Sequence, residues 1–239
     1  MPDLLRVDGQ SNAQIAVLHY PARRARNVHI VAGHGYSSSK HNLDFLCAFL
    51  AGHGIDMWSL DFPGHKLGAS GGELRGIDDC IDAMEAVTQH VITLAQSAPI
   101  YTMGHSMGAM TALFCASRDP RLAGAIAITT GYGRPSALAS LERAGATDFR
   151  SGWVDGVTLP VLVAHADLYF ERYLGGLAGR DALYIAGSRD AMVNAASVRE
   201  LFDHAPQPKS FVTIDSDHTT AADNAKSTIL AWLNERHAR

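Results

Sequence analysis

Gly104-His105-Ser106-Met107-Gly108 is the stretch of sequence that decides the fold. A β-favouring run at residues 100–103 precedes it, and residues 109–116 follow it with apolar side chains at helical spacing. This order predicts a strand, a tight turn and a helix, with Ser106 at the apex. Such a turn requires very small residues two before and two after the serine, and glycine occupies both positions. The pattern predicts a nucleophilic serine on strained backbone, facing the N–H groups of the following helix.

The composition is that of an ordinary globular protein. The chain has 239 residues, of which 47% are hydrophobic and 18% charged, so it can bury a sizeable core. Its formal charge of −4 and the lack of a basic tract beyond the loop Arg23-Arg24-Ala25-Arg26 argue against nucleic-acid binding.

The cysteines and the N-terminus indicate a cytoplasmic protein. Cys47, Cys80 and Cys115 are an odd, scattered set in apolar segments, which predicts buried reduced thiols rather than a disulfide framework or a metal site. The first residues lack a signal-peptide pattern, and no apolar run approaches membrane-spanning length. We therefore expect no metal, no cofactor and no membrane span.

Strand and helix patterns alternate along most of the chain. Residues 4–7 and 13–20 predict a hairpin, and amphipathic helices are expected at residues 42–51, 77–96, 198–204 and 221–236. Further strands are expected at residues 28–32, 55–60, 100–103, 123–129, 182–186 and 210–215. Strands that alternate with helices in this way predict an α/β fold with a mostly parallel sheet covered on both faces. The site then lies at the carboxyl ends of the strands, where Gly35, Asp61, Ser106 and Thr130 share one rim.

Residues 131–175 do not follow this alternation. Residues 131–156 are rich in Gly, Ser, Ala and Arg and show neither strand nor helix periodicity. An irregular stretch this long predicts a small cap over the site. Residues 159–174 read either as a strand that ends in Asp167 or as a helix. We favour a helix, because parallel strands must be joined by a crossover. The expectation is one domain over residues 1–239 with a cap at about 131–175.

A nucleophilic serine needs a neutral imidazole as base, and a carboxylate to orient that imidazole. His218, in the loop after the last strand, is the best placed of the twelve histidines. Asp190 follows a strand and precedes the penultimate helix, which gives the order Ser, Asp, His. Asp167 is the second candidate acid, and Asp61 is a structural turn acid or, less favourably, a displaced triad acid.

The negative oxygen of a tetrahedral intermediate requires two N–H donors. One is expected from the backbone of Met107 and the other from Tyr36, with Gly35 allowing the loop to approach closely. Gly35, His105 and Tyr132 are expected to line the substrate pocket, with His105 acting mainly as a packing residue beside the serine.

Five motifs occur in a fixed order: Gly33-His34-Gly35-Tyr36, Asp61-Phe62-Pro63-Gly64-His65, the Ser106 turn, Gly187-Ser188-Arg189-Asp190 and Asp217-His218. In this the chain resembles the α/β-hydrolase superfamily, closest to its compact esterase, monoacylglycerol-lipase-like and lysophospholipase-like members. The resemblance implies a sheet of about eight strands, a Ser106–Asp190–His218 triad and oxyanion donors at Tyr36 and Met107. Two departures are visible: the loop after Asp61 is two residues longer, and Asp190 lacks the proline that follows it in many members.

The resulting hypothesis is a serine hydrolase of carboxylic esters with small to medium acyl chains, acting through an acyl-enzyme. Thioester, amide or lactone hydrolysis uses the same triad and stays open, as does a non-catalytic ligand-binding protein of the same fold. The expected partner is a small-molecule ester, and the chain is expected to be a monomer or a homodimer.

Overall fold

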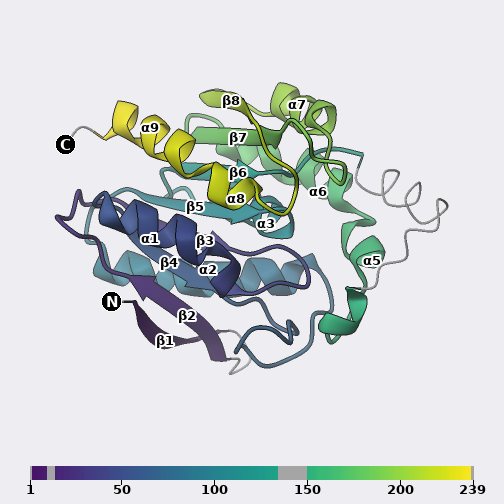
Figure 1. Ribbon diagram of the computed structural model, residues 1–239, viewed down its shortest axis with the longest axis horizontal. Coiled ribbons are helices and arrows are strands. Elements are labelled where there is room, and N and C mark those ends of the chain that lie inside the picture. Colours follow the sequence, from purple (N-terminus) through teal and green to yellow (C-terminus); the bar gives the residue numbers. More distant parts are fainter. Residues whose placement is uncertain (1, 10–13, 134–149, 238–239) are drawn as a thin grey trace.

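The computed structural model describes residues 2–9, 14–133 and 150–237. Its centre is an eight-stranded sheet in the order β1-β2-β4-β3-β5-β6-β7-β8 (Figure 1). β2 runs antiparallel to both its neighbours, and the six strands from β3 to β8 are parallel to one another. The strands are β1 (Asp3–Asp8), β2 (Gln14–Tyr20), β3 (His29–Gly33), β4 (Asp56–Leu60), β5 (Ile100–His105), β6 (Gly124–Ile128), β7 (Asp181–Gly187) and β8 (Lys209–Ile214).

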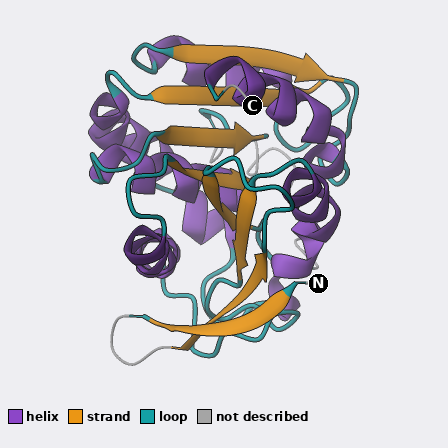
Figure 2. Cartoon of the chain, turned by 90° about the vertical axis from the view of Figure 1, so that its left-hand side faces the viewer, coloured by secondary structure: helices purple, strands orange, loops and turns teal. Residues whose placement is uncertain are grey.

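Helices cover both faces of this sheet, as Figure 2 shows from the side. One face packs against α1 (Asp44–Gly52), α8 (Ala221–Asn224) and α9 (Lys226–Arg236). The other packs against α2 (Ile77–Leu94), α3 (Met107–Arg118), α6 (Ala166–Tyr173) and α7 (Ala195–His204). The expected mostly parallel α/β sheet is therefore confirmed. No helix in the described ranges is long and apolar enough to cross a membrane.

The central strands show why their sequences are continuously apolar. In β6, Ala125 and Ala127 face the layer that contains α3, while Ile126 and Ile128 face the layer of α1 and α9. All four side chains are buried, because both faces of a parallel sheet are covered. The small alanines leave room for α3 to lie close against the sheet.

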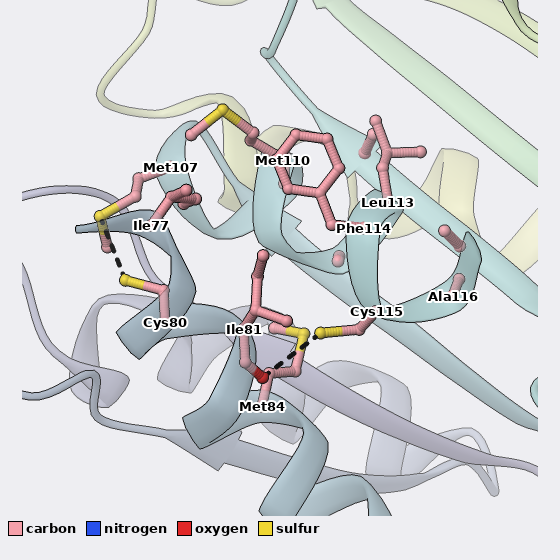
Figure 3. Packing of buried hydrophobic residues seen from close by; sticks show 14 of the residues in the cluster. Ile77, Cys80, Ile81, Met84, Met107, Met110, Leu113, Phe114, Cys115 and Ala116 are labelled. Carbon is pink, nitrogen blue, oxygen red and sulfur yellow. Dashed lines mark hydrogen bonds between the residues drawn. The ribbon is translucent and has the colours of Figure 1, made fainter. Parts of the chain in front are cut away.

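α2 and α3 pack through a layer of apolar and sulfur-containing side chains (Figure 3). Ile77, Cys80, Ile81 and Met84 recur at helical spacing on the buried face of α2. The Cys80 thiol lies 3.9 Å from the sulfur of Met107, the first residue of α3. This packing fixes the helix that follows the Ser106 turn.

The helical alternative for residues 159–174 is confirmed. α5 (Leu159–Val163) begins with a proline in its first turn, where a missing N–H costs no hydrogen bond, and α6 follows it. Two expected helices differ in detail: a 3-10 turn, η2 (Lys40–Leu43), precedes α1, and the closing helix is divided at Ala225 into α8 and α9. Residues 134–149 of the expected cap lie outside the described residues.

The described end of the segment expected to form a cap is hydrogen-bonded to the loop after β4. The Leu74 N–H donates to the Asp155 carbonyl and the Asp155 N–H donates to the Gly64 carbonyl, both at 2.8 Å. The Lys66 N–H donates to the Trp153 carbonyl at 3.0 Å. These backbone hydrogen bonds tie the loop after Asp61 to residues 153–155, which belong to the segment expected to form the cap.

Candidate active site

Ser106 lies at the turn between β5 and α3 with φ 54° and ψ −112°, in the left-handed region that a side chain rarely occupies. The tightness of the turn is visible at the two flanking glycines. A Cβ atom on Gly104 would lie 2.2 Å from the carbonyl carbon of Gly108, and one on Gly108 would lie 2.1 Å from the Gly33 oxygen. The Ser106 N–H donates to the Ile128 carbonyl at 2.9 Å, which ties the turn to β6. Only glycine fits at either flank.

Asp190 and His218 meet across the loops that follow β7 and β8. His218 Nδ1 lies 2.7 Å from Asp190 Oδ2. A carboxylate oxygen only accepts, so Nδ1 carries the proton and Nε2 of the neutral ring remains an acceptor. The other Asp190 oxygen accepts the N–H groups of Met192 at 2.9 Å and Val193 at 2.8 Å. The imidazole is thereby set in the tautomer that a general base requires.

Electrostatics keep the Asp190 carboxylate ionised. Burial alone would raise its pKa, but the hydrogen bonds from His218, Val193 and Met192 outweigh burial and hold the pKa below its usual range. The side chain of Asp190 has no exposed surface, whereas that of His218 is 13% exposed. The His218 ring is therefore accessible from the pocket, while the Asp190 carboxylate is shielded from water.

His105 holds the loop that carries His218. Its Nε2 lies 2.8 Å from the His218 carbonyl oxygen, and the two rings are 4.8 Å apart. Because a carbonyl only accepts, His105 donates from Nε2. The sequence indicated a packing residue here but gave no sign of this link, which joins two segments more than a hundred residues apart.

A small pocket brings most of the expected site residues together. Its lining includes Gly35, Tyr36, His105, Ser106 and His218. The sequence did not single out the others, which are Ser37, Ser38, Asn42, Arg150, Leu159, Met192 and Thr219. Three consecutive serines after Gly35-Tyr36 were the available signal for part of this wall.

Three expected residues lie elsewhere. The Tyr132 ring packs 5.4 Å from Phe170 and 5.0 Å from His204, and Tyr132 is not among the lining residues. Asp167, on α6, accepts the Gly133 N–H at 3.1 Å. Asp61 is paired with Lys40 at 2.7 Å. Of the three candidate acids, Asp190 is the one that His218 contacts.

Met107, at the first position of α3, has its side chain against Cys80 and its N–H at the N-terminus of the helix. A helix N-terminus favours a negative charge, because its first N–H groups have no partner within the helix. Within the described part of the chain, no three His, Cys, Asp or Glu side chains come together as metal ligands would.

The family profile described as "Serine aminopeptidase, S33" matches residues 24–167, more than half of the chain. The chain belongs to this family. A stretch of 96 residues is 33% identical to a monoglyceride lipase homologue of monkeypox virus. The matching stretch covers 39% of this S33-family chain and 34% of the viral protein, so it spans about a third of that relative's length.

Solved structures show the same fold over nearly the whole length. The Pyrococcus furiosus esterase Pf2001 has a TM-score of 0.76 at 17% identity, covering 100% of this chain and 94% of that one. Est1E from Butyrivibrio proteoclasticus, solved with ferulic acid bound, has a TM-score of 0.79 at 15% identity, covering 98% and 100%. At such identities the likeness shows the α/β-hydrolase fold alone.

Proposed function

We propose that this S33-family protein hydrolyses carboxylic esters through an acyl-enzyme formed on Ser106. One observation carries the proposal: His218, which hydrogen-bonds Asp190 at 2.7 Å, lines the same pocket as Ser106, a serine held in a strained turn. The names of the relatives, a monoglyceride lipase homologue and two esterases, support the ester as substrate class.

The reaction follows from the roles of the atoms. His218 Nε2 takes the hydroxyl proton of Ser106 as Oγ attacks the ester carbonyl, and Asp190 stabilises the imidazolium that forms. The N–H groups of Met107 and Tyr36 bind the oxygen that becomes negative. The C–O bond of the ester then breaks, and the alcohol leaves with the proton from His218. Water activated by the same histidine hydrolyses the acyl-enzyme and regenerates Ser106.

The size of the pocket supports a small to medium acyl chain. The described residues enclose a cavity of about 80 Å³ beside Ser106. Pockets that enclose drug-sized ligands usually hold about 300–1,000 Å³. Leu159 and Met192 supply apolar wall against which a short chain can lie.

The test is labelling with a fluorophosphonate probe, with Ser106→Ala as the matched control. We expect the wild type to be labelled and the variant to remain unlabelled. Hydrolysis of p-nitrophenyl esters from C2 to C12 should show an optimum at short or medium chains. A folded wild-type protein that takes no label would overturn the proposal and leave a non-catalytic binding protein of the same fold.

Amide hydrolysis is a second candidate, favoured by the description of the family as serine aminopeptidases. The same triad attacks amides, although the amine leaves less readily than an alcohol. Aminoacyl p-nitroanilides distinguish the two: a kcat/KM above that for the best p-nitrophenyl ester would make the protein a peptidase.

A further inference from the structure

His34, the residue before Gly35, is completely buried and uses both ring nitrogens. The Phe62 N–H donates to His34 Nε2 at 3.0 Å, so that nitrogen carries no proton. His34 Nδ1 lies 2.7 Å from the Gly35 carbonyl oxygen, which only accepts, so Nδ1 carries the proton. The contacts of the ring therefore define a single neutral tautomer.

The Gly35 carbonyl belongs to the same peptide group as the Tyr36 N–H. A trans peptide is planar, and its C=O and N–H point in opposite directions. Because the carbonyl faces the buried imidazole of His34, the N–H faces away from it. Gly35 and Tyr36 line the pocket, and a Cβ on Gly35 would lie 3.6 Å from Ser106 Cβ. The Gly35–Tyr36 peptide thus borders the pocket that Ser106 also lines.

We infer that His34 is a positioning residue, which orients the Gly35–Tyr36 peptide so that its N–H binds the oxyanion, and that Lys40 and Asp61 hold the same loop in place. This inference rests on the proposed hydrolase function. It assigns roles to three buried polar residues that do not touch the substrate.

The loop after β4 binds both ends of the segment from His34 to Lys40, which we call the oxyanion loop. At one end its Phe62 N–H binds His34. At the other, Asp61 accepts the Lys40 N–H on Oδ1 and the Lys40 ammonium on Oδ2, both at 2.7 Å. Lys40 is 3% exposed and Asp61 is fully buried, so water does not weaken this pair. The segment between His34 and Lys40, which includes Gly35 and Tyr36, is held at its two ends.

The ionisation states of His34 and Asp61 agree with these hydrogen bonds. Burial, together with nearby His65, lowers the pKa of His34 to about 3, so the ring stays neutral at physiological pH. Burial alone would raise the pKa of Asp61, but the hydrogen bonds from Lys40 and the Ala69 N–H lower it instead. The one ionic pair in this set is therefore Lys40–Asp61, and His34 acts as a neutral donor.

His34→Asn and His34→Gln form the matched pair that tests the inference. The Asn amide nitrogen reaches the place of Nδ1 and can donate to Gly35, whereas the Gln amide reaches the place of Nε2 and cannot. Interactions with the oxyanion strengthen in the transition state, so their loss lowers kcat and spares KM. We expect kcat of His34→Gln to fall about 10–100-fold and that of His34→Asn to stay within about 5-fold of wild type, with KM little changed.

Lys40→Met tests the other end of the loop, with Lys66→Met as its control. Lys66 forms an exposed pair with Asp155, and its loss should leave kcat unchanged. Lys40→Met should lower kcat about 10-fold. All variants are compared at temperatures where circular dichroism shows them folded.

Two kinds of failure are distinguishable. No fluorophosphonate labelling of the wild type overturns the proposed function and the positioning role together. A labelled wild type with equal kcat in the Asn and Gln variants overturns the positioning role alone. A lower kcat in His34→Gln together with a near wild-type kcat in His34→Asn supports the positioning role. This comparison remains valid even if a more disruptive variant such as His34→Leu fails to fold.

Discussion

Gly108→Ala should uncouple the reactive turn from the oxyanion loop. The added Cβ would lie 2.1 Å from the Gly33 oxygen, 2.5 Å from the Gly33 carbonyl carbon and 2.6 Å from the His34 oxygen. All three are backbone atoms of β3 and the residue after it, so no side chain can rotate away. α3 must retreat from β3 by more than 1 Å to restore ordinary contact.

The cost follows from that displacement. Overpacking a filled core costs about 1–3 kcal/mol, and for a chain of this size each kcal/mol lowers Tm by about 2–4 °C. The same retreat moves the Met107 N–H and Ser106 away from the Gly35–Tyr36 peptide. A misplacement of about 1 Å in a catalytic group can lower the rate about 100-fold. We expect both losses in one variant.

The assays are thermal unfolding and the rate of fluorophosphonate labelling, with Gly52→Ala as control. Gly52 ends α1, and a Cβ there meets nothing within 4 Å, so this variant should be as stable as wild type or more so by about 0.5–1 kcal/mol. Equal Tm and labelling rates for Gly108→Ala and wild type would show that the turn does not need its glycine.

Two further outcomes are expected from the described contacts. Asp190→Asn replaces an acceptor that fixes the His218 tautomer, so kcat should fall about 10³–10⁴-fold with Tm little changed; a fall below 10-fold would contradict the role of Asp190. Acid should destabilise the protein through His34: its pKa is about 3 when folded and about 6.5 when unfolded, so the unfolded chain binds the extra proton between these values. The free energy of unfolding should be unaffected by His34 above pH 6.5 and should fall by about 4 kcal/mol between pH 6.5 and pH 3. Urea unfolding should show this fall in the wild type but not in His34→Gln, which has no imidazole to protonate. An equal pH dependence of the two proteins would refute the assignment.

The sequence predicted the parts of the molecule that local pattern controls. The Ser106 turn is encoded by two glycines and its flanking apolar runs, and the strands by short apolar segments at regular intervals. Chain order selected Asp190 over Asp167, and the helical crossover at residues 159–174 follows from the parallel neighbours β6 and β7.

What it could not predict are contacts between loops that are distant in sequence. His105 donates a hydrogen bond to the His218 carbonyl, and Lys40 pairs with Asp61. The sequence separation of neither pair follows a pattern that would predict the contact. Tyr132 shows the converse: from the sequence we expected it to line the pocket, yet its ring lies against Phe170. The end of a strand fixes where the backbone of the next residues lies, but not the direction in which a side chain points.

The strain at Ser106 persists because neighbouring elements hold the turn from several sides. β6 accepts its N–H, β3 lies in contact with Gly108, and α2 packs on Met107 through Cys80. A residue in sparsely populated backbone is stable only when its surroundings overdetermine it. The same contacts fix the N-terminus of α3 relative to the oxyanion loop, which is itself tied to the loop after β4. The fold thus orders the proposed nucleophile and its proposed N–H donors before any substrate binds, so binding a substrate need not supply the free energy to assemble them.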